Sequence, residues 1–355
     1  MQNKDDIVIV SAARTPFSNF TSAMGDIPSI DLGVMVMKEV VSRVGINPGE
    51  IDEINYGSCV LAELALETDV PARQATLLAG FPAENISLTL DRACCSSLTC
   101  LRLGFRAIRA GEAEIVMTVG SENMCRTPHL APGLRKGVRL GHIQLIDGLF
   151  ELGYAAKGFN AVAKDAGEVA LEHGVTREMQ DAWAQGSQEK YAKAFAAGKY
   201  KIGEELIPVI IPQKKGDPIV IEKDESPRKT TMEALAKLRP IYGSPTVTAG
   251  NAPPLSAGSS AILFMTRQKA NEKGLKPMAT IVATVASATA PRAIAEIPAY
   301  TILKALDKSG LTLDQMDLIE INEAFAAVTL TATKMLANDD EQKWQKILDR
   351  TNVNG

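Results

Sequence analysis

The amino-acid sequence predicts an α/β protein that consists of two similar halves with an insertion between them. Short runs rich in Ile and Val alternate with helical segments, a pattern that is typical of parallel sheets with crossover helices. A helix–turn–strand unit recurs after 265 residues, which is the separation of Gly45 and Gly310. Residues 121 to about 250 match neither half, so they are expected to form the insertion.

The expected strands are short and apolar, as strands buried on both faces of a sheet are. They are residues 7–11, 53–57, 86–90, 114–119, 261–265, 280–285 and 318–321. The helical segments between them are residues 32–44, 70–79, 97–110, 177–197, 268–273, 298–309 and 325–336.

An internal repeat defines the two halves. Residues 45–55 and 310–320 align without a gap, and each follows an amphipathic helix of about the same length. Duplication of one unit explains this alignment. Chance similarity is the alternative, because a glycine at a helix C-terminus is common. Under the same offset residue 90 falls on Gly355, so the second half is expected to be incomplete.

These boundaries predict three domains. The first half comprises residues 1–120 and is continued by about 245–270, residues 121–244 form an inserted loop or cap domain, and residues 271–355 form a truncated second half. The insertion carries a basic segment with Lys214, Lys215, Lys223, Arg228 and Lys229. Such a segment can give a local positive patch for phosphates, or it can be a solvated loop.

Composition excludes several classes of function. Lys and Arg number 38 against 42 Asp and Glu, and aromatic residues are 5% of 355, which argues against nucleic-acid binding. No apolar run approaches the roughly 20 residues of a membrane-spanning helix. The three His are scattered and the five Cys contain no C-x-x-C pair, so neither a metal site nor a disulfide framework is expected. We therefore expect a protein of the reducing cytoplasm.

The segment around Cys94 is the most informative for chemistry. An apolar strand, residues 86–90, runs into a sharp turn and then into the helix of residues 97–110. Cys94 is expected at the helix N-terminus, where the helix dipole and free N–H groups favour a thiolate and can stabilise an oxyanion. Alternatively, Cys94, Cys95 and Cys100 are small buried hydrophobic residues, as most free cysteines are.

Two further segments carry candidate residues. At residues 319–326 a strand ends in Asn322 and Glu323 and turns at once into a helix, so Asn322 could present its amide to a carbonyl or a water. The alternative is an ordinary N-cap, for which Asn is a preferred residue. Residues 246–260 are rich in small side chains that let a ligand approach the backbone, or they form a tight loop between packed elements.

Together these segments resemble the thiolases. The matching motifs are residues 10–17, 71–75, 91–94, 177–181, 235–240, 246–252 and 321–325, in the order and spacing of that family. The resemblance implies two tandem βαβαβαββ halves in a five-layered αβαβα arrangement, with an inserted loop domain. It also implies an acyl-CoA:acetyl-CoA C-acyltransferase of fatty acid metabolism. Such an enzyme has coenzyme A as a substrate and no cofactor or metal, and it forms homodimers or homotetramers.

The resemblance also implies roles for individual residues. Cys94 resembles the nucleophile that takes the acyl group as a thioester, and its N–H resembles a donor of one oxyanion hole. Asn322 resembles the residue that positions a water in the other oxyanion hole. Arg228 matches the basic residue beside the CoA nucleotide, and Ala324 and Phe325 match residues that line the pantetheine channel.

Departures from the family pattern leave alternatives open. The family's catalytic His and second Cys are expected beyond the match at residues 352–355, and Pro253 stands where a Ser that contacts pantetheine is usual. A non-catalytic, thiolase-like CoA-binding or scaffold subunit is therefore one alternative. Another condensing enzyme of the same fold is a second, although Asn322 occupies a position where those enzymes commonly have a His.

Overall fold

The computed structural model describes residues 5–151 and 158–355. The chain forms two compact units, and each is described by itself. Unit 1 comprises Met1–Leu149, Tyr200–Ser226 and Leu255–Thr284, and unit 2 comprises Phe150–Lys199, Pro227–Pro254 and Val285–Gly355. Residues 121–244, assigned from the sequence to an inserted domain, are thus distributed over both units.

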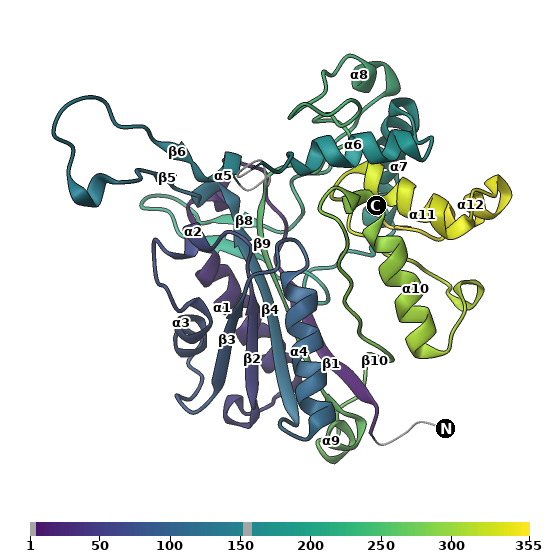
Figure 1. Ribbon diagram of the computed structural model, residues 1–355. Helices are drawn as coiled ribbons and strands as arrows, with labels where there is room; N and C mark the ends of the chain where they lie inside the picture. The colour runs from purple at the N-terminus through teal and green to yellow at the C-terminus, as the bar shows by residue number, and fades with distance from the viewer. Residues whose placement is uncertain (1–4, 152–157) are drawn as a thin grey trace. The chain divides into compact units, whose positions relative to one another are not determined.

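Unit 1 contains a six-stranded mixed sheet with the strand order β10-β1-β9-β4-β2-β3 (Figure 1). Its strands are β1 (Ile7–Arg14), β2 (Glu53–Gly57), β3 (Ile86–Leu90), β4 (Ile115–Asn123), β9 (Ala257–Thr266) and β10 (Ala279–Ile281). Strand β2 runs parallel to β3 and β4, as the sequence predicts. Strand β9 runs antiparallel to β1 and β4, so the expectation of a purely parallel sheet is wrong.

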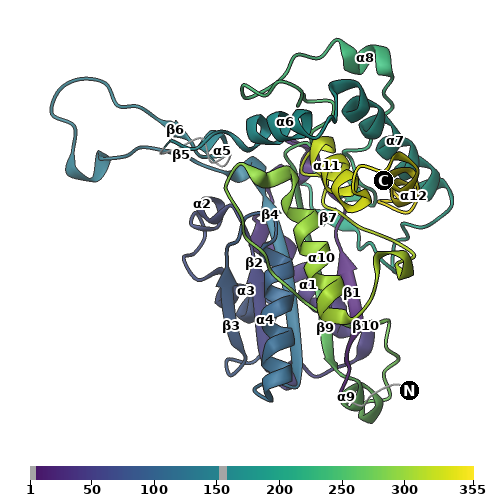
Figure 2. The same ribbon diagram turned by 45° about the vertical axis from the view of Figure 1, so that its right-hand side comes forward.

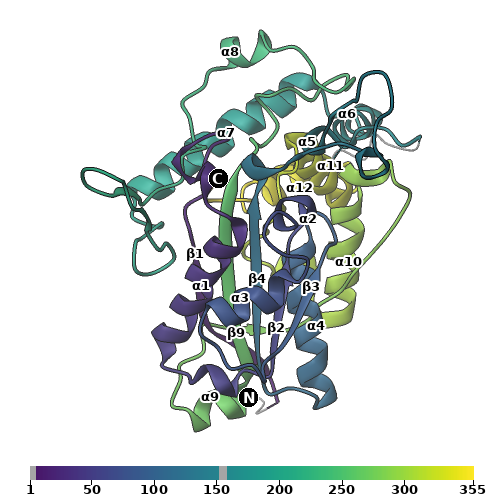
Figure 3. The same ribbon diagram turned by 90° about the vertical axis from the view of Figure 1, so that its left-hand side faces the viewer.

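Helices cover both faces of this sheet. Helices α1 (Ser29–Val44) and α3 (Pro71–Leu78) lie on one face, and α4 (Ser96–Ala110) lies on the other (Figures 1 and 3). The larger core is formed by α1 with β1, β2, β4 and β9, because the apolar stripe of α1 packs on Ile54 and Met117. Phe105 and Ile108 of α4 fill a second core on the opposite face. Two short helices, α2 (Leu61–Leu64) and α9 (Arg267–Glu272), also belong to this unit.

Two small hairpins also belong to unit 1. Strands β5 (His129–Leu130) and β6 (Ile146–Asp147) form the base of the long hairpin that projects from the unit in Figures 1 and 2. Strands β7 (Val209–Ile211) and β8 (Ile219–Ile221) form the other. The exposed Lys214 and Lys215 lie in its connection. Arg228 belongs to unit 2, so the basic segment of the sequence is divided between the units.

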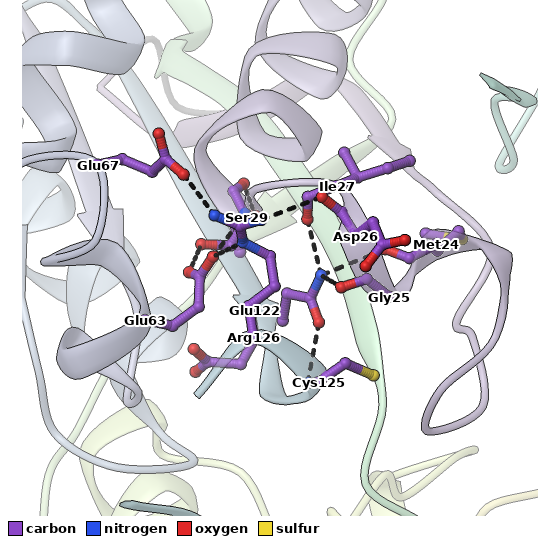
Figure 4. Close-up of polar contacts among 12 residues, drawn as sticks. Met24, Gly25, Asp26, Ile27, Ser29, Glu63, Glu67, Glu122, Cys125 and Arg126 are labelled. Carbon is purple, nitrogen blue, oxygen red and sulfur yellow. Dashed lines mark hydrogen bonds and ion pairs between the residues drawn. The ribbon is translucent and has the colours of Figure 1, made fainter. Parts of the chain in front are cut away.

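A buried polar network fixes the loops beyond the carboxyl end of β4 (Figure 4). The carboxylate of Glu63, which is fully buried, accepts hydrogen bonds from the Ser29 backbone N–H and hydroxyl and pairs with Arg126 Nε at 3.0 Å. The Asn123 amide donates to the carbonyl oxygens of Met24, Gly25 and Ile27. These hydrogen bonds tie the loops before α1 and after β2 to the end of β4.

Unit 2 is a helical assembly around α11. Its helices are α6 (Val162–Glu172), α7 (Arg177–Ala196), α8 (Met232–Ala236), α10 (Ile297–Ser309), α11 (Ala326–Ala337) and α12 (Glu341–Leu348). Helix α5 (Gly148–Glu151) begins at the last residues of unit 1. Ten of the twelve α11 residues are buried, and α6, α7, α10 and α12 pack around it. An apolar helix buried on all sides is expected at the centre of such an assembly.

The internal repeat has the same local structure in both copies. Helix α1 ends at Gly45 and α10 ends at Gly310, and both glycines are left-handed, with φ of 63° and 70°. A 3₁₀ turn follows each glycine after two residues, at Pro48–Glu50 and at Leu313–Gln315. The residue offset between the copies is unchanged through these elements. This correspondence supports duplication over chance similarity.

The strands expected in the second half differ from those observed. The expected strand 280–285 is β10, which ends at Ile281 and joins the sheet of unit 1. It ends there because its antiparallel partner β1 begins at Ile7, which is paired with Ile281. The expected strand 318–321 is reduced to a single bridge between Ile319 and Thr351. Its backbone bonds go instead to the end of the chain: the Ile319 N–H donates to the Arg350 carbonyl, and the Ile319 carbonyl accepts from the Asn352 N–H, both at 2.9 Å.

Candidate active site

Cys94 lies in a tight turn between β3 and α4. Ala93, the residue before it, has a left-handed φ of 49°, which is uncommon for a residue with a side chain. Three hydrogen bonds hold this conformation. Asp91 Oδ1 accepts from the Ala93 N–H at 2.8 Å, and the Ser96 hydroxyl accepts from the Arg92 N–H at 2.8 Å and donates to the Ala93 carbonyl at 2.6 Å. The turn leaves Cys94 exposed, so the interpretation as a buried hydrophobic residue holds for Cys100 and not for Cys94.

The Cys94 turn lies at the carboxyl-end edge of the parallel strands. Glu122 near the end of β4 accepts hydrogen bonds from the three residues that follow β2: Ser58 Oγ at 2.9 Å, the Cys59 N–H at 2.7 Å and the Val60 N–H at 3.1 Å. Ser58 in turn donates its N–H to the carbonyl of the last residue of β3 at 3.1 Å. The ends of β4, β2 and β3 are therefore joined by hydrogen bonds just before the chain enters the turn.

The surroundings of Cys94 favour the protonated thiol. Although the residue is exposed, nearby protein displaces enough water from Sγ to raise its pKa. Its own backbone N–H acts in the opposite sense, while Cys95 and Glu122 raise the pKa further. The prediction of a thiolate favoured by the helix N-terminus is therefore wrong in direction. The helix begins only at Ser96, so its free N–H groups lie beyond Cys94. Attack by this sulfur requires a base.

Asn322 lies in unit 2, in the turn that precedes α11. Asn322 is exposed, and its backbone carbonyl accepts a hydrogen bond from the Ala324 N–H at 2.8 Å. The N-cap of α11 is Phe325, three residues later, so the interpretation of Asn322 as an ordinary N-cap is wrong. Among the residues that the structure describes, no group hydrogen-bonds the Asn322 amide. The amide is thus available to a ligand or a water.

A cleft of about 180 Å³ opens in unit 2 beside this turn. Its walls come from α7, from residues 250–254 and from Glu323 and Ala326, which flank the turn. Arg228 also lines it. The Arg228 guanidinium donates to the Ala249 carbonyl at 2.9 Å, and its backbone N–H donates to Gln188 at 2.8 Å. The small-residue segment at 246–260 therefore contributes a wall of a cleft.

The predicted CoA-binding residues differ in their positions. Arg228 lines the cleft, whereas Ala324 and Phe325 are partly buried against the core of unit 2. Three residues of α7 that were not predicted also line the cleft: Ala184, Ser187 and Gln188. Their spacing of three and four places them on one face of the helix, and this spacing is the signal that could have identified them.

Other kinds of site have no support in the part of the chain that is described. Within residues 5–151 and 158–355, no three His, Cys, Asp or Glu side chains are grouped so as to hold a metal ion. None of the described helices combines the length and apolarity needed to cross a bilayer.

Comparison with known protein families identifies the family of this chain. Residues 7–268 match the model of the thiolase N-terminal domain, and residues 275–355 match that of the thiolase C-terminal domain. The chain belongs to the thiolase family. The family assignment and the fold class expected from the sequence are thereby confirmed, while the expected truncation of the second half stays a prediction.

Members of the thiolase family resemble this chain along almost all of its length. It is 39% identical to an acetyl-CoA acetyltransferase of Pseudomonas aeruginosa and 36% identical to a probable acetyl-CoA acetyltransferase of Escherichia coli. The crystal structure of the Bacillus anthracis acetyl-CoA acetyltransferase aligns with a TM-score of 0.90 at 34% identity. That of human mitochondrial 3-ketoacyl-CoA thiolase aligns with 0.89 at 31%. Each match covers 99% of this chain and 86% of the relative.

Proposed function

We propose that this thiolase is an acyl-CoA:acetyl-CoA C-acyltransferase with Cys94 as its nucleophile. The observation that carries the proposal is the exposed Cys94 sulfur on a strained turn between β3 and α4. Relatives 39% and 36% identical are named acetyl-CoA acetyltransferase and probable acetyl-CoA acetyltransferase, which supports the same activity here. These relationships favour an enzyme over the non-catalytic scaffold.

The proposed reaction proceeds in two steps. In thiolysis, the Cys94 sulfur attacks the 3-keto carbon of a 3-ketoacyl-CoA, and the bond between the α and β carbons breaks. The electron pair of that bond takes up a proton, acetyl-CoA leaves, and the acyl group remains on Cys94 as a thioester. The sulfur of CoA then attacks this thioester and releases a shortened acyl-CoA. Division through a covalent intermediate lowers the barrier of each step, and the reverse sequence joins two acyl-CoAs.

The other predicted residues have roles in binding and in stabilising charge. Asn322 holds a water that stabilises a developing oxyanion, which its exposed and unpaired amide permits. The Cys94 N–H contributes to the second oxyanion hole. Arg228 contacts the phosphates of CoA, since its guanidinium lies in the wall of a cleft. Ala324 and Phe325 line the pantetheine channel. Coenzyme A enters as a substrate, and no separate cofactor takes part.

Assembly and location form the last part of the proposal. We expect a cytoplasmic homodimer or homotetramer that acts in fatty acid metabolism. Strand β3 supports self-association, because it is an edge strand of its sheet and exposes 65% of Ile86 and 45% of Leu88. An apolar edge strand readily pairs with another chain.

The test is the intact mass of the protein after incubation with acetyl-CoA, followed by peptide mapping. An acetyl group mapped to Cys94, and absent from the C94S variant, is the expected result. C95S is the matched control, because Cys95 is also exposed but is the N-cap of α4. Acetylation of C94S to the same extent, or no adduct on any variant in a preparation with turnover, would overturn the assignment of Cys94.

A further inference from the structure

The carboxylate of Glu323, in the turn before α11, accepts three hydrogen bonds from other side chains. Its Oε1 accepts from Trp183 Nε1 at 2.9 Å and from Asn352 Nδ2 at 2.8 Å, and its Oε2 accepts from Ser187 Oγ at 3.0 Å. Two of these donors belong to α7, and the third comes from the end of the chain. The carboxylate therefore ties the turn before α11 to two other segments of unit 2.

Asn352 holds the same turn from its other side. The residue is buried and has a left-handed φ of 46°. Its Oδ1 accepts from the Ile321 N–H at 2.9 Å, and its Nδ2 donates to the Ile321 carbonyl at 2.8 Å as well as to Glu323. The Asn352 side-chain amide thus pairs with both backbone polar groups of Ile321, as a residue of a neighbouring strand would. Its own N–H donates to the Ile319 carbonyl at 2.9 Å, so side chain and backbone bind the segment together.

Ile321 and Glu323 are thus both held by hydrogen bonds, and Asn322 is the residue between them in the chain. We propose that Glu323 and Asn352 are positioning residues that fix the backbone on both sides of Asn322 and so aim its exposed amide. This inference rests on the proposed role of Asn322 in stabilising an oxyanion. Oxyanion stabilisation demands donors that are fixed before the reaction, because a group that must reorganise during the reaction loses most of its effect.

The hydrogen bonds of Glu323 favour a positioning function over proton transfer. A general base needs a lone pair directed at the substrate, whereas three protein donors already occupy most of the roughly four acceptor positions of this carboxylate. Glu323 interacts electrostatically with Lys190, whose Nζ donates to the Thr351 carbonyl at 3.1 Å, and with Glu320. Neither of these is among the hydrogen-bond partners of the carboxylate.

The two roles predict opposite behaviour for an isosteric change. In E323Q the amide oxygen can still accept from Trp183 and Asn352, and the new NH₂ group can donate to the Ser187 oxygen. A positioning residue therefore tolerates E323Q, and kcat for thiolysis of acetoacetyl-CoA is expected to stay close to that of the unchanged protein. E323A loses all three contacts, and kcat is expected to fall about 100-fold, the effect of a misplaced catalytic group. The matched control is E320A, which removes a carboxylate three residues earlier and should leave kcat unchanged.

A double-mutant cycle separates positioning from general damage. In an N322A background E323A is expected to have little further effect on kcat, because there is no amide left to aim. Acetylation of Cys94 by acetyl-CoA, measured by mass, should reach the same extent in E323A as in the unchanged protein. Additive losses in the cycle, loss of acetylation in step with turnover, or a kcat of E323Q as low as that of E323A would each overturn the inference. If N322A itself retains full kcat, the proposed role of Asn322 fails instead.

Discussion

The carboxylate of Glu122 accepts hydrogen bonds from both donors of Cys59, the backbone N–H and the thiol. Its Oε2 accepts from the Cys59 backbone N–H at 2.7 Å and from Cys59 Sγ at 2.8 Å. Burial raises the pKa of Glu122, and the hydrogen bonds that it accepts from Cys59, Ser58 and Val60 act against that effect. Glu122 also interacts electrostatically with Cys94, and this interaction raises the pKa of the Cys94 thiol.

The first prediction concerns the reactivity of Cys94. The Glu122 charge is one of the causes that raise the Cys94 pKa, so E122Q should lower this pKa and speed alkylation by iodoacetamide. The sign follows from the chemistry, because only the thiolate reacts and a nearby negative charge disfavours it. The measurement is the rate of Cys94 modification between about pH 7 and pH 10, a range that spans the usual thiol pKa. An unchanged or slower rate in E122Q, with the fold checked by circular dichroism, would contradict the prediction.

The second prediction concerns stability. Arg126 neutralises Glu63, whose side chain is fully buried, and it also pairs with the more exposed Glu67. R126A leaves a buried carboxylate without its cation, so we expect the free energy of unfolding to fall by about 3 kcal/mol. E67A removes the exposed pair alone and should cost less than about 1 kcal/mol. Urea denaturation of both variants measures the difference, and equal losses would show that burial of Glu63 is unimportant.

The third prediction concerns the contact between α4 and the sheet. A methyl group added at Gly104 would lie 2.4 Å from Val116 Cγ1 and 2.8 Å from Phe264 Cζ, so G104A must push the helix away from the sheet. We expect a loss of about 1–3 kcal/mol, typical of an overpacked core. G186A on α7 is the control, because nothing lies within 4 Å of the added carbon. There, the higher helix propensity of Ala should stabilise the protein by up to about 1 kcal/mol. Thermal unfolding of the pair tests both signs.

The fourth prediction concerns binding of CoA. If Arg228 contacts the phosphates, R228A should raise KM for CoA about 10-fold, equivalent to ~1.4 kcal/mol, without a large change in kcat. The neighbouring Lys229 is also exposed but does not line the cleft, so K229A should have a smaller effect. Equal effects of the two substitutions would point to general electrostatic attraction and against a specific contact.

Several elements of both units could be predicted because their signals are local. Strands β2 and β3 have the expected bounds, and the helices ending at Gly45 and Gly310 stop where the glycine predicts. Periodicity and glycine stops depend on a few neighbouring residues, which the sequence displays directly. The turn at Cys94 was found for the same reason, since a strand, a cysteine and a helix follow one another without a gap.

Features that depend on distant partners could not be predicted. The antiparallel course of β9 and the end of β10 are set by pairing with β1, more than 240 residues away in the chain for β9. The Cys94 pKa depends on burial and on Glu122, which periodicity does not reveal. Gln188 and Ser187 escaped notice because a residue on a helix face is marked as part of a binding site only by what packs opposite it.

The repeated turn after α1 and α10 shows what duplication conserves. Asn47 with Glu50 closes the turn in one copy, and Thr312 with Gln315 closes it in the other. The residues at both equivalent positions differ between the copies, yet each pair still forms a reciprocal capping box. The two copies therefore differ in amino-acid sequence at this turn but keep the same pattern of hydrogen bonds. Sequence identity between the halves consequently understates their similarity, and a comparison of donor–acceptor pairs would detect the duplication more sensitively.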